Sequence, residues 1–420
     1  MIKKPKDMIE RLIKLKQDYS DIMEKACYRD SNLNLSIKRA FEAFINQGQN
    51  IAMQLARHVD FLMRNQIRGM NEEQISTEFD QALEIFRLLT DKDEFENFYR
   101  AQLTKRLLNQ LSFSEDSEKM MIVKLKSECG CNYTQKMEIM MRDIQVSKDL
   151  NEDFQREARA RDQEFGFNVM VLTTGNWSND KAETSCDLPR QLESSIYNFT
   201  DFYMNKYHCV TNNVRSDTTE RKFGRSLTWK LNFGHADMTA HFAKDYEIQV
   251  TGYMMCILLK FNDHREMTLG QIRQETQIQP EHELRRHLVS LLKRGILRKT
   301  DQPASFSPDD RIYVNEEFEN RLLKFKVSLV TSKESASKET KQIVERMDED
   351  RRHIVEATIV RIMKSRKTME HNQLVSESIT QLSRLFEPRP LLIKQRIETL
   401  IEKEYVKRDS KDKRLYHYIA

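Results

Sequence analysis

Glycine and proline are scarce in this sequence, which contains 10 Gly and 7 Pro among its 420 residues. No proline occurs between Pro5 and Pro189, and because proline interrupts helices, a stretch of this length without one is most simply helical. Charged residues make up 32% of the chain and hydrophobic residues 39%, a balance typical of long amphipathic helices. The composition therefore excludes collagen-like chains, glycine-rich linkers, propellers and turn-dense barrels.

The sequence also lacks the marks of secretion and of membrane insertion. Its six cysteines are too scattered for a disulfide scaffold and fit a reducing compartment. The longest apolar run, 253–259, is far shorter than the roughly 18 residues that span a bilayer. The start of the chain, MIKKPKDMIE, has no apolar signal core. We therefore expect a soluble intracellular protein without a membrane partner.

Motifs of catalysis, cofactor binding and metal binding are missing as well. The sequence has no GxxxxGK[ST], GxGxxG or HExxH pattern. Its one close cysteine pair, Cys129 and Cys131, has no second pair at the spacing of zinc ligands. His282 and His287 lie on a charged helix, where we expect them to be solvated. The sequence therefore predicts no enzyme, no metal site and no cofactor.

What the sequence does contain is hydrophobic periodicity, which changes along the chain. Residues 1–150 repeat their apolar positions at the helical spacing of about 3.6 and predict a helical bundle. Over 151–250 the pattern alternates, at 167–171 and 227–233, and two further strands are expected near 238–250. One helix, at about 190–207, interrupts these strands, so we predict a small α/β subdomain with an antiparallel sheet.

The last 170 residues contain an internal repeat. HLVSLLKRGILRK (287–299) aligns with RIETLIEKEYVKR (396–408), and each copy follows a helix-turn-helix pattern and precedes a second short strand. Helices followed by a hairpin predict two winged-helix domains, at 251–330 and 345–420. The apolar-poor residues 331–344 predict a linker between them. The predicted fold is thus mainly α with an α+β part.

Winged helices often bind DNA, and residues 341–420 carry 18 Lys+Arg against 13 Asp+Glu. The candidate recognition helix, 391–405, mixes Lys394, Arg396 and Lys403 with three glutamates. A helix that reads the major groove needs a concentrated positive face. Because the glutamates cancel much of that charge, the sequence gives only weak support to nucleic-acid binding, which stays an alternative function.

One lysine of the last domain stands apart in geometry. A helix turns about 100° per residue, so Val355, Ile359 and Ile362 share one face, which we expect to be buried. Lys364 lies about 180° from Val355 and points outward. Its basic neighbours make the neutral, nucleophilic amine more accessible; they are Arg361, Arg366 and Lys367. This geometry alone is also that of an ordinary surface lysine.

This segment, IVRIMKSRK (359–367), and the ending Tyr416–Ala420 resemble the cullin family. Further blocks that resemble cullins are FYRAQLTKRLL (98–108), DSEKMMIVKLKSECGC (116–131), LTTGNW (172–177) and GRSLTW (224–229). The resemblance spans nearly the whole chain. The ECGC block resembles the type that works with BTB adaptors, whereas LSRLFEPRP and SKDLNEDF resemble the type that works with F-box adaptors.

The resemblance implies a non-catalytic scaffold of a cullin–RING ubiquitin ligase in the cytoplasm and nucleus. A RING-H2 subunit would add a strand along 167–173 and 225–251 and would recruit a ubiquitin-conjugating enzyme. Lys364 matches the lysine that receives a ubiquitin-like modifier from its own conjugating enzyme through an isopeptide bond. Further implied partners are the cullin regulators, an exchange factor and a deneddylating complex. The linker would give the modified domain room to move.

Three departures from the family pattern accompany the resemblance. Ser178 stands where the family usually has proline, and residues 209–223 form an insertion beside the predicted sheet. The family also carries three helical repeats before the bundle, so we expect the adaptor-binding arm to be absent from this chain. An alternative function is therefore a truncated cullin that sequesters RING subunits.

Overall fold

The computed structural model describes residues 5–26, 30–48, 50–157, 165–178, 186–207, 225–300, 307–330, 333–383 and 385–419. The predicted insertion at 209–223 lies outside these residues. No helix within the described ranges is long and apolar enough to cross a membrane. The chain divides into two compact units, which we describe separately. The first comprises Met1–Arg142, Thr173–Ser178 and Glu334–Ala420, and the second comprises Asp143–Leu172 and Asn179–Lys333.

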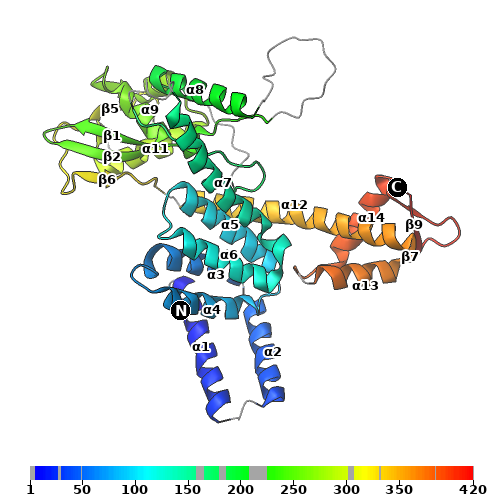
Figure 1. Ribbon diagram of the computed structural model, residues 1–420. Coiled ribbons are helices and arrows are strands. Elements are labelled where there is room, and N and C mark those ends of the chain that lie inside the picture. The colour runs from blue at the N-terminus through cyan, green and yellow to red at the C-terminus, as the bar shows by residue number, and fades with distance from the viewer. Residues whose placement is uncertain are drawn as a thin grey trace. The chain divides into compact units, whose positions relative to one another are not determined.

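The first unit begins with the predicted helical bundle (Figure 1). Its helices are α1 (Pro5–Lys25), α2 (Ser31–Gln47), α3 (Ile51–Phe61), α4 (Glu72–Phe86), α5 (Lys92–Leu108), α6 (Glu115–Cys129) and the first half of α7 (Cys131–Arg156). Helix α3 packs along α5, and α4 packs on α6. Gly130 separates α6 from α7 with a positive φ of 84°, a conformation that glycine adopts without strain.

A buried ion pair lies inside the bundle. The guanidinium of Arg106 donates from Nε to Oε1 of Glu118 at 2.6 Å and from Nη2 to Oε2 at 2.9 Å. Its Nη1 donates to Asp60 at 2.8 Å. The side chains of Arg106 and Glu118 are both 0% exposed, so each charge depends on the other for the interactions that water would otherwise supply.

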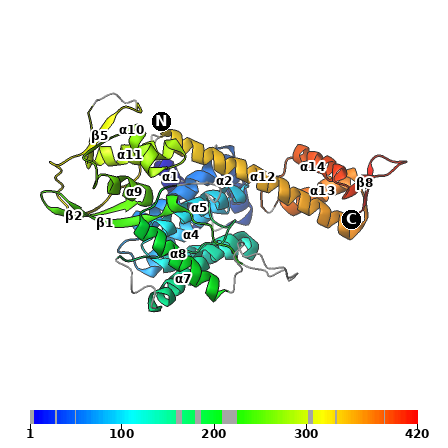
Figure 2. The same ribbon diagram turned by 90° about the horizontal axis from the view of Figure 1, so that it is seen from above.

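The first unit ends with a winged helix, whose other elements lie at the carboxyl end of the long helix α12 (Figure 2). Its elements are α12 (Lys333–Arg366), β7 (Thr368–Glu370), α13 (His371–Leu382), α14 (Pro390–Glu402), β8 (Val406–Arg408) and β9 (Leu415–Tyr418). The three strands form an antiparallel sheet in the order β7-β9-β8. The sequence predicts a linker over 331–344, but residues from Lys333 onward belong to α12. The described part of this apolar-poor segment can be helical because it contains good helix formers such as Lys and Glu.

The second unit contains the second half of α7, α8 (Arg190–Lys206) and two small sheets. Strands β1 (His235–His241) and β2 (Asp245–Thr251) pair antiparallel, as expected, but β6 (Lys324–Lys326) joins β2 in parallel, so the sheet is mixed rather than antiparallel. The other elements are α9 (Gly252–Lys260), β3 (Glu266–Thr268), α10 (Leu269–Thr276), α11 (Glu281–Arg294), β4 (Leu297–Lys299) and β5 (Arg311–Val314). They form the first winged helix, with a sheet in the order β3-β5-β4.

Two predicted strands take other conformations. Residues 167–172 belong to no sheet, although Phe167, Val169 and Val171 all pack on one cluster, the alternation typical of an extended chain. Leu227 and Trp229 alternate in the same way, but the chain then forms a 3-10 turn at Leu231–Phe233 instead of continuing as a strand. Gly252 packs closely against this turn: its N–H donates to the carbonyl of Gly234 at 2.7 Å, and a Cβ at its position would lie 3.2 Å from the carbonyl oxygen of Leu231.

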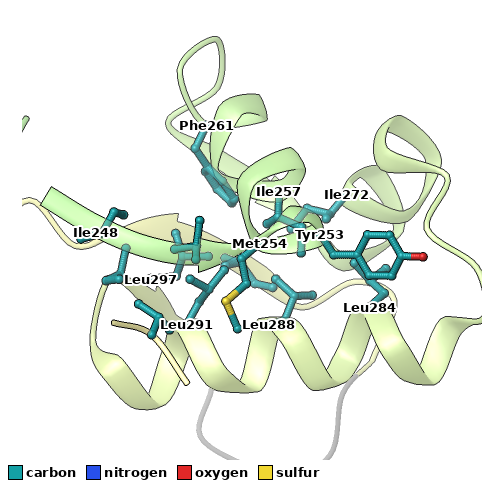
Figure 3. Close-up of a cluster of buried hydrophobic side chains, with 14 of the residues drawn as sticks. Ile248, Tyr253, Met254, Ile257, Phe261, Ile272, Leu284, Leu288, Leu291 and Leu297 are labelled. Atoms are coloured by element: carbon teal, nitrogen blue, oxygen red, sulfur yellow. The ribbon is translucent and has the colours of Figure 1, made fainter. Parts of the chain in front are cut away.

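The mixed sheet and the first winged helix share one hydrophobic core (Figure 3). Ile248 of β2 and Met254 and Ile257 of α9 face a row of leucines on α11. The row follows the helical spacing at Leu284, Leu288 and Leu291, all 0% exposed. His287 falls on this same face and is 1% exposed, so the expectation that it is solvated was wrong.

His287 is held in its neutral form by its surroundings. Burial lowers its pKa from 6.5, and the hydrogen bond between Nδ1 and the carbonyl oxygen of Glu283, at 2.7 Å, opposes that shift. Its Nε2 is buried and has no hydrogen-bond partner among the described residues. The charged groups beside it are the carboxylate of Glu283, 3.9 Å from Nδ1, and Arg286. A second proton on the ring would therefore be buried without an acceptor.

We predict that acidification weakens this core. Below pH 6.5 His287 is protonated in the unfolded chain but not in the folded chain. As the pH decreases, the free energy of unfolding therefore decreases by at most about 1.4 kcal/mol per pH unit, until the lowered pKa of the folded state is reached. The measurement is the urea midpoint for unfolding of α9 and α11 between pH 7.5 and 5.5. His287→Gln should flatten this dependence, and His282→Gln, an exposed control on the same helix, should not. Equal slopes for all three proteins would contradict the prediction.

Candidate functional site

Lys364 lies on the exposed face of α12 near its carboxyl end. The face predicted to point inward is buried, with Val355 and Ile359 0% exposed and Ile362 1% exposed. Lys364 itself is exposed, and within the described part of the chain its amine makes no ion pair or hydrogen bond. The side chain is therefore accessible to a large partner.

The end of α12 below Lys364 is fixed by the last strand of the chain. Lys367 has a positive φ of 65° and ends the helix, with its N–H bonded to the carbonyl of Met363 at 2.8 Å. Its carbonyl accepts the N–H of Tyr418 at 2.9 Å, and its ammonium lies 5.1 Å from the centroid of the Tyr418 ring. Lys364 thus lies on a helix whose end is fixed by the last strand, rather than on a loop.

The same helix is fastened to the bundle by Arg351. Its guanidinium binds both carboxylate oxygens of Asp93, at 2.5 and 2.7 Å, and stacks 4.8 Å from the centroid of the Phe386 ring. Burial raises the pKa of Asp93, and the bond from Arg351 opposes that rise. Two more hydrogen bonds complete the junction. The N–H of Asp93 donates to the carbonyl of Leu385, and the N–H of Glu387 donates to the carboxylate of Asp91. Within the first unit, the amino end of α5 therefore anchors the winged helix that carries Lys364.

Two of the three cations named in the candidate recognition helix, Arg396 and Lys403, form ion pairs inside this domain. Arg396 of α14 and Lys403, the residue that follows this helix, both pair with Glu356 of α12, at 3.4 and 3.0 Å. Arg408 pairs with Glu398. Because a nucleic-acid surface must offer its cations to phosphates, these contacts weaken the nucleic-acid alternative.

The second candidate site is an aromatic cluster in the second unit covered by two extended segments. Its buried members come from α7 and α8: Leu150, Phe154, Phe199, Phe202 and Tyr203. Alternate side chains of both segments pack on it, from Phe167 to Val171 and at Leu227 and Trp229. The rings of Phe167 and Trp229 lie 6.5 Å apart, so both segments cover the same cluster.

The first extended segment, residues 167–172, has one bonded edge and one open edge. Side chains of α7 bond the edge formed by Val169 and Val171. Among the described residues, the backbone groups of Asn168, Met170 and Leu172 have no hydrogen-bond partner. An open backbone edge is a template for an added strand.

The predicted docking segments, 167–173 and 225–251, are therefore not one sheet in the described structure. Residues 235–251 pair among themselves and with β6, whereas 167–172 and 225–229 belong to no ladder. Two features of these sites escaped the sequence analysis. Ser147 and Asn151, which bond the inner edge, carry a detectable signal as polar residues four apart on a helix face that also buries Leu150 and Phe154. The Arg351–Asp93 pair joins residues 258 positions apart and leaves no local signal.

The architecture is that of a helical bundle followed by an α/β part and a terminal winged helix with an exposed lysine. Three family models match it in that order: the cullin alpha solenoid domain over residues 1–151, the cullin alpha+beta domain over 171–318 and the cullin protein neddylation domain over 350–412. The last of these ranges includes Lys364. The chain belongs to the cullin family.

Individual relatives agree with this membership. The chain is 35% identical to Cullin-3 of Dictyostelium discoideum over 450 aligned residues, 33% identical to Cullin-3A of Arabidopsis thaliana and 33% identical to Cullin-3 of Caenorhabditis elegans. These alignments cover 98 to 100% of this chain and 56% of each relative. The chain therefore spans about half the length of the relatives it matches.

Proposed function

We propose that the chain is the scaffold part of a cullin–RING ubiquitin ligase that binds a RING-H2 subunit and is modified at Lys364. The observation that carries the proposal is the open backbone edge at residues 168–172 in a chain that also has a neddylation-domain match. One strand of the RING-H2 subunit would pair with this edge, since main-chain hydrogen bonds supply affinity in strand addition. The RING-H2 subunit would in turn recruit a ubiquitin-conjugating enzyme.

The chemistry proposed for Lys364 needs only a free amine and space around it. The neutral amine attacks the thioester carbonyl that joins the modifier to its conjugating enzyme. A C–N bond forms, the C–S bond breaks, and the proton lost by the amine passes to the departing thiolate, directly or through water. The chain supplies the nucleophile and the partner supplies the activated carbonyl. An exchange factor and a deneddylating complex would then act on the bound state in the cytoplasm and nucleus.

We predict that Met170→Pro abolishes co-purification of a RING-H2 subunit expressed with this chain. Proline removes the N–H that residue 170 offers on the open edge and cannot sit inside a paired strand. Met170→Ala is the matched control, because it changes the same exposed side chain and keeps the backbone donor; it should co-purify in the wild-type ratio. Failure of the wild-type chain to bind any RING-H2 subunit would overturn the proposed function. Equal binding by the proline variant would show that the open edge is not where the RING-H2 subunit binds.

A further inference from the structure

The extended segment 167–172 lies beside a helix that bonds it in place of a neighbouring strand. In a strand, the N–H and C=O of successive residues point to opposite edges. Val169 and Val171 direct theirs toward α7, and Asn168 and Met170 direct theirs away. The helix therefore bonds one edge, at Val169 and Val171, and leaves the other edge without a partner among the described residues.

The bonds on the inner edge imitate a strand ladder. Asn151 accepts the N–H of Val169 at Oδ1, at 2.8 Å, and donates from Nδ2 to the carbonyl of Val169 at 2.9 Å. Its amide thus exchanges a donor and an acceptor with one residue, as a peptide group does in an antiparallel pair. Ser147 accepts the N–H of Val171 at 2.8 Å, and its hydroxyl lies 3.2 Å from the carbonyl of Val171 and 2.7 Å from that of Asp143.

The spacing of side chains along the helix matches the spacing of backbone groups along the extended segment, so that two helix residues can bond two segment residues. Residues four apart on a helix rise by about 6 Å, and residues two apart on a strand by about 6.7 Å. Ser147 and Asn151 are four apart, and they bond Val171 and Val169, which are two apart, in the opposite chain direction. A third rung does not follow, because Gln155 reaches the side chain of Asn168, at 3.3 Å, rather than the backbone.

We propose that Ser147 and Asn151 are positioning residues that act as a substitute strand. They hold residues 167–172 extended in the free chain, so that the outer edge is already formed when a strand of the RING-H2 subunit arrives. The identity of that partner rests on the proposed function, whereas the holding of the segment does not. Pre-formation raises affinity because the segment's conformational entropy is lost before binding rather than during it.

The test compares the double variant Ser147→Ala/Asn151→Leu with Gln155→Leu in the full chain. The double variant removes both backbone contacts, and the control removes the side-chain contact one turn further along the same helix. We expect the double variant to bind a purified RING-H2 subunit at least about tenfold more weakly, since the side-chain hydrogen bonds that fix the backbone of Val169 and Val171 are all lost. Gln155→Leu should bind like the wild type.

Amide hydrogen exchange separates positioning from general stability. In the free double variant the amides of Val169 and Val171 should exchange faster while those of α8 keep their protection. In the wild-type complex Asn168 and Met170 should gain protection. Should the double variant disturb the fold, Ser147→Ala and Ser147→Thr provide the comparison, because threonine keeps the hydroxyl and should restore slow exchange at Val171.

Each outcome decides one of the two claims. Wild-type binding with equal affinity in the double variant overturns the substitute strand and leaves the proposed function standing. New protection at Val169 and Val171 on binding, instead of at Asn168 and Met170, overturns the choice of edge. If the wild-type chain does not bind a RING-H2 subunit, the proposed function fails. The positioning role is then decided by amide exchange alone: faster exchange at Val169 in the double variant supports it, and unchanged exchange overturns it.

Discussion

Replacing Lys364 with arginine is expected to abolish attachment of the ubiquitin-like modifier to this chain. Arginine keeps the positive charge and the helix propensity of lysine, but its guanidinium stays protonated and is no nucleophile toward a thioester. The fold should be unaffected, because Lys364 is exposed and has no partner among the described residues. The measurement is the intact mass of the chain after incubation with the modifier, its activating and conjugating enzymes and ATP.

Lys367→Arg is the matched control for this experiment. Lys367 lies three residues further along the same basic stretch, and its ammonium is engaged with the ring of Tyr418. The control should be modified as the wild type is, with the adduct mapped by peptide mass spectrometry to Lys364. An undiminished adduct on the Lys364→Arg protein, or loss of the adduct only in the control, would show that the acceptor is another lysine.

Replacing Arg106 with alanine is expected to unfold much of the bundle. The change leaves Glu118 buried without its main cationic partner, and breaking a buried pair in this way costs about 3–5 kcal/mol. That is a large part of the roughly 5–15 kcal/mol by which domains are stable. Thermal unfolding followed by far-ultraviolet circular dichroism should show a clear fall in the transition assigned to the bundle.

Two further variants give this result its meaning. Arg87→Ala removes an exposed partner of Glu128, at 2.6 Å, and should cost less than about 1 kcal/mol. The double variant Arg106→Met/Glu118→Leu replaces the pair by apolar side chains and should recover most of the stability lost in Arg106→Ala. If Arg87→Ala and Arg106→Ala were equally destabilising, burial of the central pair would not be the cause.

Much of the fold follows from local patterns in the sequence. The repeat that aligns 287–299 with 396–408 correctly predicts two winged helices, since α11 and α14 and the strands after them keep that offset. The buried face of α12 follows from the positions of Val355, Ile359 and Ile362 alone. These predictions succeed because one helix face or one strand needs no information from distant residues.

The failures share the opposite property. The alternation at 167–171 predicts an extended chain correctly, but whether that chain joins a ladder depends on what lies beside it. The parallel pairing of β6 with β2 and the burial of His287 likewise depend on contacts from elsewhere in the chain. At the candidate sites, the sequence singles out Lys364 and the docking segments, whereas Ser147, Asn151 and Arg351 become visible only through their partners.

Helix α12 also fixes the direction in which anything attached to Lys364 grows. Thirteen residues separate Arg351 from Lys364, which is three full turns and about 220° further around the axis, and about 20 Å along it. The two side chains are thus about 140° apart in phase, so a modifier on Lys364 projects away from the face that grips Asp93. A modifier at Lys364 would thus start from a different face of the helix than the Arg351–Asp93 contact, and an insertion of one residue between them would rotate Lys364 by about 100° relative to Arg351.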